Sequence, residues 1–255
     1  PGLVRLDPRW HQAAWRFIVL GFEHILDGID HLLFLLVLVV PIRSFLALVP
    51  IVTSFTIAHS ITLIASAFGM VPNFLWFPPL IETLIAASIV YMALENIVGS
   101  QWQKRWIIAF AFGLVHGFGF SFALSEIMQF AGGHLLTSLL AFNLGVELGQ
   151  ILIILIAVPI INFLFRNVVA ERMGTIILSA ILAHSGWHWM SERASELVEY
   201  SFYWPAFDAA FFASLMRWMM LLVVVGAILW AMVQVYDRLL GGAQERELSH
   251  SPDTG

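Results

Sequence analysis

The sequence predicts an all-α polytopic membrane protein, folded as a bundle of about seven transmembrane helices. Hydrophobic residues make up 60% of the 255 residues and charged residues only 11%, and the mean hydropathy is +0.88. A soluble protein of this size needs far more charge to cover its surface. Apolar stretches of about 20 residues, the length that crosses a bilayer, also recur along the chain. Both observations place the chain in a membrane, and we expect a multi-pass protein of the bacterial inner (plasma) membrane.

Short polar breaks separate the expected elements. Pro41 and Arg43 mark one turn, and prolines close to Trp76 mark another, as at an aromatic interfacial belt. We expect an N-terminal extracytoplasmic arm over 1–12, a transmembrane domain over 13–240 and a disordered tail over 241–255. The seven spans are predicted at residues 13–40, 44–69, 79–99, 105–130, 134–163, 171–192 and 207–237.

Basic residues predict the orientation of the bundle. Most of them lie in the loops expected on the side of the C-terminus, and two loops on the opposite side have none. This bias puts the C-terminus in the cytoplasm and the N-terminus outside. The basic residues on the predicted cytoplasmic side are Arg43, Lys104, Arg105, Arg166, Arg172, Arg238 and Arg246.

Charge and residue types exclude several kinds of partner and site. The net charge is −5 and no basic run occurs, so nucleic acid is not an expected partner. The chain has no cysteine, which excludes disulfides, thiolate metal sites and thiol catalysis. The expected partners are the lipid bilayer and a metal ion, and a homo-oligomer or a membrane-complex partner stays open.

Ionisable residues inside the first span indicate a site, because a charged side chain at mid-bilayer costs at least about 2.5–3.5 kcal/mol. This span contains Glu23, His24, Asp27, Asp30 and His31. On one continuous helix His24, Asp27 and His31 would share a face, with Asp30 beside it. Two histidines and three carboxylates in one span are more than helix packing requires.

Other spans carry polar residues at a similar predicted depth. His59 lies in the second span and His116 in the fourth. Glu147 lies in the fifth, and the sixth has His184 and His188 one turn apart. Counted from the outer end of each span, polar residues of five helices fall into one slab, so we predict a common metal site. The candidate ligands are His24, Asp27, Asp30, His31, His59, His116, Glu147, His184 and His188.

Imidazole and carboxylate groups without thiolate suit a borderline divalent ion. Neutral histidines and anionic aspartates also lower the cost of dehydrating a cation inside the membrane. We therefore expect a divalent transition metal ion, with nickel, cobalt and zinc as candidates. A proton relay through a buried Asp–His pair is the alternative.

The stretch from His24 to the Asp30-His31 pair resembles the histidine-x5-aspartate-histidine signature of the HupE/UreJ family. That family comprises hydrogenase and urease accessory membrane proteins regarded as nickel or cobalt permeases. Ile25 stands where the commoner family pattern has proline, which indicates a divergent branch. The resemblance implies that His24, Asp30 and His31 are primary metal ligands.

Two further segments, Phe142–Gln150 and His116-Gly117, are similar to other membrane motifs of the family. The resemblance covers about residues 15–190. It implies that His59, His116 and Glu147 complete or relay the site. His184 and His188 are assigned on their helical spacing alone.

Three functions are compatible with such a site, and a permease for nickel or cobalt is favoured over an enzyme. The second is an intramembrane zinc-dependent hydrolase with its site in the outer half of the bilayer; Ser54, His59 and the His184–His188 pair weakly resemble the seven-helix ceramidase-like superfamily. A site closed toward the cytoplasm would favour this enzyme. The third is a non-catalytic accessory subunit of a membrane complex, which would bind no metal.

Overall fold

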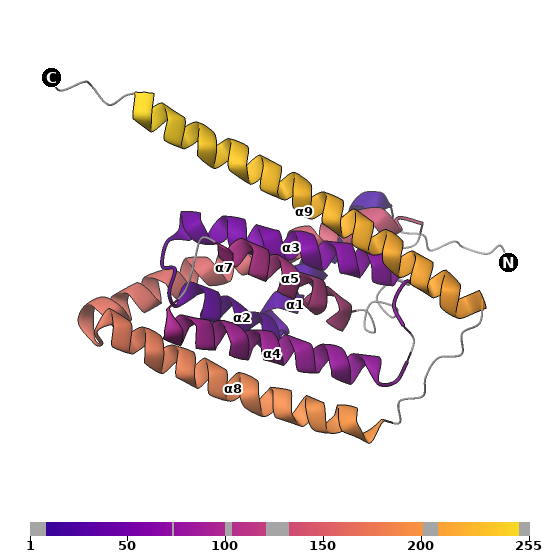
Figure 1. Cartoon of the computed structure of the whole chain (residues 1–255), viewed down its shortest axis with the longest axis horizontal. Helices are drawn as coiled ribbons and strands as arrows, with labels where there is room; N and C mark the ends of the chain where they lie inside the picture. The colour runs from indigo at the N-terminus through magenta and orange to yellow at the C-terminus, as the bar shows by residue number, and fades with distance from the viewer. Residues whose placement is uncertain (1–8, 73, 100–103, 121–132, 201–208, 250–255) are drawn as a thin grey trace. The chain divides into compact units, whose positions relative to one another are not determined.

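The computed structural model describes residues 9–72, 74–99, 104–120, 133–200 and 209–249 of the chain, and the side chains as far as Tyr236. Within these ranges it contains only α-helices, which confirms the all-α class (Figure 1). The chain divides into two compact units, Pro1–Phe202 and Tyr203–Gly255.

Four of the described helices are long and apolar enough to cross a membrane by length and composition. They are α3 (Phe45–Ala67), α4 (Phe77–Val98), α7 (Leu135–Asn167) and the part Ala209–Tyr236 of α9 (Ala209–Ser249). The remaining described helices are α1 (Trp10–Asp27), α2 (Ile29–Val39), α5 (Arg105–Gly119) and α8 (Glu171–Glu199). The membrane class is supported, and the count of seven spans stays a prediction.

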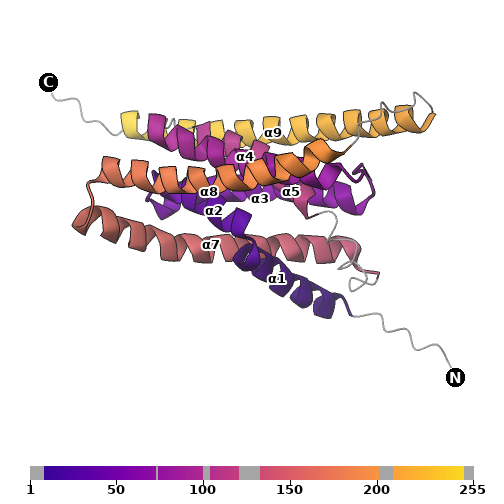
Figure 2. The ribbon, with the colours of Figure 1, turned by 90° about the horizontal axis from the view of Figure 1, so that it is seen from below.

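The first predicted span is not one helix, because the chain breaks at Gly28. Its backbone is extended, with φ −78° and ψ 98°, and it separates α1 from α2. The two helices run at an angle to each other (Figure 2). The prediction of one continuous helix over 13–40 is therefore wrong, and with it the shared face of His24, Asp27 and His31. Glycine loses more backbone entropy in a helix than other residues, so a break here is inexpensive.

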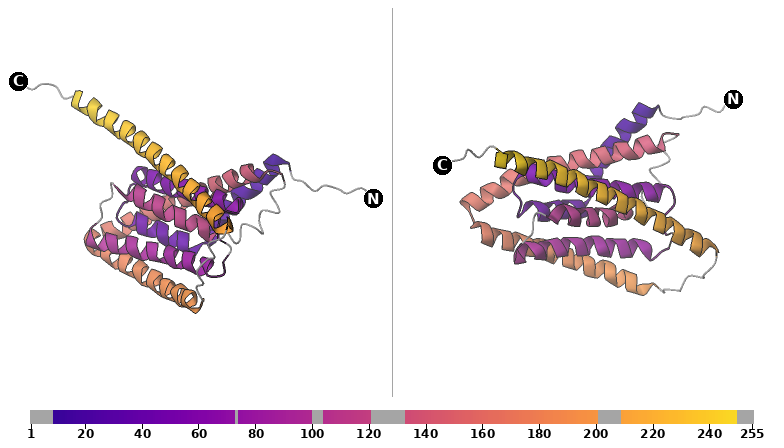
Figure 3. Two further views of the ribbon diagram at one scale, coloured as in Figure 1. Left: turned by 45° about the vertical axis from the view of Figure 1, so that its right-hand side comes forward. Right: turned by 45° about the horizontal axis from the view of Figure 1, so that its top comes forward.

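Within the first unit, α1 packs against α7, α3 against α5 and α4 against α8. Figure 3 shows α1 and α7 next to each other. Glycines allow the close approach in the first two pairs. A Cβ atom on Gly145 would collide with the carbonyl oxygen of Ile18, and one on Gly113 with that of Phe55. Helix α2 is the most buried of these helices and contacts α1, α4, α7 and α8.

A buried polar group links α2, α4 and α5 at one end of the unit. The guanidinium of Arg105, at the start of α5, is fully buried and donates to Glu95 Oε2 at 3.0 Å. It also donates to Asn96 Oδ1. The Asn96 amide in turn donates to the carbonyl of Val37 in α2, at 2.8 Å. These three side chains, named the arginine lock below, hold the three helices together.

Three helices continue past the C-terminal ends of the predicted spans, and the shortest of these extensions is that of α7 to Asn167, past residue 163. Helix α8 continues to Glu199, past residue 192, and α9 continues to Ser249. Residues 241–249 of the expected tail are therefore helical. Residues 243–248 are of types that favour a helix. Residues 1–8 of the expected arm and 250–255 of the tail lie outside the described residues.

Candidate metal centre

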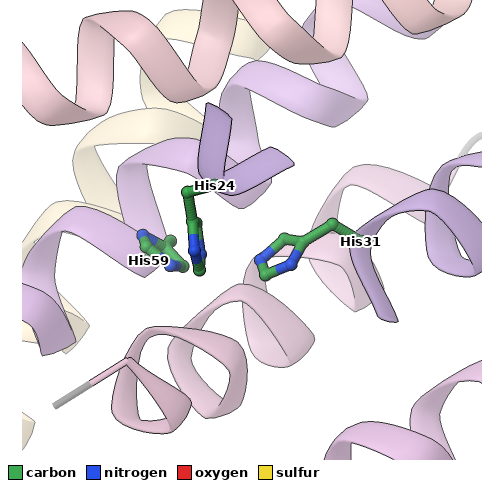
Figure 4. Close-up of side chains that lie close together, drawn as sticks. All are labelled: His24, His31 and His59. Atoms are coloured by element: carbon green, nitrogen blue, oxygen red, sulfur yellow. The ribbon is translucent and has the colours of Figure 1, made fainter. Parts of the chain in front are cut away.

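Three histidines from three helices point toward one another (Figure 4). His24 lies near the end of α1, His31 in the first turn of α2 and His59 in α3. Their ring centroids are separated by 4.7 Å (His24–His31), 6.1 Å (His31–His59) and 6.2 Å (His24–His59). One donor atom from each lies within 4.8 Å of the others. Nitrogens that share one ion lie about 3.3 Å apart, so small ring movements would close the site.

A second set of donors shares His31 with the first. Asp30, His31 and His116 also offer atoms within 4.8 Å of one another. His116 lies in α5, and its ring centroid is 5.5 Å from that of His31. The Asp30 carboxylate lies 3.1 Å from His31 Nδ1. His24, Asp30, His31, His59 and His116 are called the histidine cluster below.

Asn143 holds His59 in one tautomer. The Asn143 amide nitrogen donates to the carbonyl of Leu139 at 2.8 Å, so the amide oxygen faces His59 Nδ1 at 3.4 Å. Because that oxygen can only accept, the proton is assigned to His59 Nδ1. The lone pair then lies on Nε2, which is buried and has no hydrogen-bond partner among the described residues.

Ser88 in α4 holds His116 in the same manner. Its hydroxyl donates to the carbonyl of Ile85 at 2.6 Å, so its oxygen accepts from His116 Nε2 at 3.1 Å. The lone pair is thereby assigned to His116 Nδ1, which is buried without a partner in the described part of the chain. Ser88 was not among the candidates from the sequence, because a lone serine in an apolar span is ordinarily bonded only to its own helix.

The donor set fits a divalent transition metal. Buried nitrogens without partners are costly in a folded protein, whereas neutral imidazole with a free lone pair is the form that binds such a metal. The space next to His31 and Asp30 is open because residue 28 is a glycine and has no side chain. A Cβ atom there would lie 2.8 Å from His31 Nδ1 and 2.9 Å from Asp30 Oδ1. The buried nitrogens without a partner among the described residues include His24 Nε2, His31 Nε2, His59 Nε2 and His116 Nδ1.

A cavity of about 360 Å³ lies next to the cluster. Its lining includes the exposed carboxylates of Glu23 and Asp27, together with His24, so it is an acidic approach to the cluster. Asp27 therefore lines the cavity and does not belong to either set of donors. The other lining residues are Leu20, Gly28 and Phe120.

Aromatic rings cover the part of the cluster that does not line the cavity. The ring centroids of Phe34 and Phe55 lie 5.1 and 5.0 Å from that of His116. Both phenylalanines are 1% exposed. Phenylalanines also pack against His24, with the ring centroids of Phe120 and Phe142 4.4 and 5.5 Å from its own, but of the two histidines only His24 lines the cavity.

Besides Asp27, three predicted ligands lie outside the cluster. Glu147 accepts a hydrogen bond from the Thr53 hydroxyl at 2.5 Å, which links α7 to α3. His184 and His188 lie with ring centroids 4.5 Å apart on an exposed face of α8. Gly186, on the buried face of α8, packs against α4 instead. Helical spacing puts two histidines on one face, but it does not determine which way that face turns.

Comparison with known proteins gives one family. The model of the family described as HupE / UreJ protein matches residues 3–193. Neither the curated proteins nor the solved structures gave a match. The matched range contains the whole histidine cluster and ends within α8, before α9. The family is one of membrane proteins associated with nickel or cobalt, and this chain belongs to it.

Proposed function

We propose that the chain is a membrane permease for a divalent transition metal, with nickel or cobalt as its cargo. The observation that carries this proposal is the convergence of four imidazoles from α1, α2, α3 and α5, each with a buried ring nitrogen that has no partner among the described residues. The association of the HupE/UreJ family with nickel and cobalt supports the choice of cargo.

Each part of the arrangement has a role in this proposal. Glu23 and Asp27 attract a hydrated cation to the cavity. The imidazoles then replace its water molecules, and Asp30 offsets part of its charge. With neutral imidazoles and one carboxylate, the ion keeps a net positive charge, so it is bound without being held as tightly as in a thiolate site.

We propose that the predicted topology, with seven spans and the N-terminus outside, applies to this permease. Helices α1 and α2 together would make the first crossing, since 18 and 11 residues extend about 27 and 16 Å at 1.5 Å per residue. Trp10 and Trp15 are 61% and 68% exposed near the start of α1, as expected for residues at a membrane interface. The cavity lined by Glu23 would then open toward the outside.

Nickel accumulation in cells tests the proposal. His24→Ala and Asp30→Ala should lower uptake by at least about tenfold at equal amounts of protein in the membrane, because each removes a ligand. His11→Ala is the matched control, since His11 lies in the same helix as His24 but is exposed and contacts Trp10. Normal uptake in both ligand variants would contradict the proposal.

One observation favours the zinc-dependent hydrolase as a second candidate. The cluster adjoins a cavity at His24 and is packed against Phe34 and Phe55 at His116, and three histidines around zinc with one open position can activate water. Exchange distinguishes the two functions. Purified protein with stoichiometric zinc that resists replacement by nickel would support the hydrolase. Rapid exchange of the bound metal would support the permease, and purified protein without any bound metal would support an accessory subunit.

A further inference from the structure

His31 belongs to both convergent sets of donor atoms, and its ring can serve them from two edges. Its Nδ1 lies 3.1 Å from the Asp30 carboxylate. Its Nε2, on the other edge of the ring, is buried without a partner among the described residues. An imidazole can bind a metal through either ring nitrogen. The set of His24, His31 and His59 and the set of Asp30, His31 and His116 are therefore two positions joined by one ring.

The two sets differ in that only the first contains a histidine that lines the cavity. His24 lines the cavity, so the set that contains it is directly accessible. His116 does not line the cavity, is 1% exposed and packs against Phe34 and Phe55. We call the first set the mouth position and the second the deep position.

Ser88 belongs to the deep position only. It fixes the tautomer of His116 through the hydrogen bond to Nε2 and has no described contact with the mouth position. His59 of the mouth position is fixed separately, by Asn143. Each position thus has its own supporting residue from a different helix, α4 for Ser88 and α7 for Asn143.

We propose that the histidine cluster offers two cation positions in series, occupied first at the mouth and then in the deep position, with Ser88 as the positioning residue of the latter. This inference rests on the proposed transport function. The cation gives up its bonds to His24 and His59 for bonds to Asp30 and His116, and it passes from one ring nitrogen of His31 to the other, so the ring proton moves to the nitrogen that the cation leaves. The cation never loses all its ligands at once, which lowers the barrier to movement as in other conduction paths with several sites.

Binding and transport measured on the same variants test the two positions. The experiment titrates the purified full chain with Ni²⁺ and measures Ni²⁺ transport in proteoliposomes. His59→Asn should weaken binding by at least about tenfold, because it removes a ligand of the mouth position. His116→Asn should leave the Ni²⁺ affinity close to that of the wild type and lower the transport rate by at least about tenfold. His31→Asn should lower both the Ni²⁺ affinity and the transport rate, because His31 belongs to both positions.

Equal loss of affinity in His59→Asn and His116→Asn would overturn the proposal, since all four imidazoles would then hold one ion. Failure of the wild type to transport Ni²⁺ would instead contradict the permease, and the affinities of the two variants would still decide between one position and two. The two failures are therefore distinguishable.

Ser88→Ala tests the positioning role without removing a ligand. The transport rate should fall by about tenfold, as for other residues that orient a metal-binding histidine, while the Ni²⁺ affinity and the unfolding temperature stay close to those of the wild type. Ser66→Ala is the matched control, because the Ser66 hydroxyl has one hydrogen bond within the described residues, to the carbonyl of Thr62 in its own helix. A wild-type transport rate in Ser88→Ala, or an equal loss in Ser66→Ala, would refute the role of Ser88.

Discussion

Gly28 lies where His24, Asp30 and His31 meet, and it has two consequences for the cluster. The extended backbone at this residue ends α1 and allows His31 to turn toward His24. The missing side chain leaves free the space that borders His31 Nδ1 and Asp30 Oδ1. Its φ of −78° is open to any residue, so the requirement for glycine comes from space and not from backbone conformation.

Gly28→Ala should therefore weaken Ni²⁺ binding and shift the backbone between α1 and α2, because the added methyl group would also lie 2.8 Å from the carbonyl oxygen of His24. The added methyl group would lie 2.8 Å from His31 Nδ1 and displace that ring, and we expect a loss of affinity of about tenfold. Titration of purified protein with Ni²⁺ measures it, and circular dichroism checks the helical content. Gly226→Ala in α9 is the control, because a Cβ atom there meets nothing within 4 Å. Wild-type affinity in Gly28→Ala would show that this space is not part of the site.

At the scale of residues, the sequence was a good guide to which histidines lie close together and a poor guide to the residues that hydrogen-bond to them. His24, His31, His59 and His116 were expected at one depth because buried ionisable groups in separate spans need one another, and they lie together in the structure. Ser88 could not be recognised, because its bond to His116 crosses between helices whose rotation is set by packing.

The rotation of each helix also decides which predicted ligands stay outside the cluster. His184 and His188 are exposed on α8 because Gly186 and Leu182 take the buried face of that helix. Glu147 accepts a hydrogen bond from Thr53 at Oε1, and its Oε2 is buried without a partner among the described residues. Their roles as ligands stay predictions, and neither set of donor atoms found among the described residues includes them.

At the scale of elements, the arginine lock holds α2 against α4 and α5. Arg105 is 0% exposed and Glu95 16% exposed in their side chains, so the pair is largely shielded from water. Removing one partner of such a pair leaves an uncompensated buried charge, whereas removing both does not. The arginine lock was not predicted from the sequence, because Lys104 and Arg105 were interpreted only as part of a cytoplasmic loop.

Glu95→Gln should consequently destabilise the protein by about 3–5 kcal/mol, and the double variant Glu95→Gln with Arg105→Met by less than the sum of the single changes. Thermal unfolding of the purified protein in detergent measures these effects. The control is Glu196→Gln, which removes a more exposed partner of Arg193, 2.9 Å away, and should cost less than about 1 kcal/mol. Strictly additive effects at residues 95 and 105 would show that the two side chains do not act as a pair.

At the scale of the whole molecule, the number of membrane crossings depends on how the shorter helices combine. Four described helices are long and apolar enough to cross by themselves. The other helices would cross only together with a neighbour, as we propose for α1 and α2, or by burying their polar residues against neighbouring helices. Hydropathy along the chain found the apolar stretches, but it could not show that the first of them is broken, since glycine is also tolerated within membrane helices.

Single cysteines can determine the topology, because the chain has none of its own. Phe68→Cys, at an exposed residue after α3, should react with a membrane-impermeant maleimide in intact spheroplasts. Lys104→Cys, exposed just before α5, should react only after the membrane is opened. Gly255→Cys should behave like Lys104→Cys if the chain crosses the membrane seven times with its N-terminus outside, because an odd number of crossings puts the two ends on opposite sides. If Gly255→Cys is labelled in intact spheroplasts while Phe68→Cys and Lys104→Cys react as expected, the number of membrane crossings is even and the prediction of seven is wrong. If Phe68→Cys is protected and Lys104→Cys is labelled in intact spheroplasts, the orientation of the bundle is the opposite of the predicted one, and the acidic cavity faces the cytoplasm.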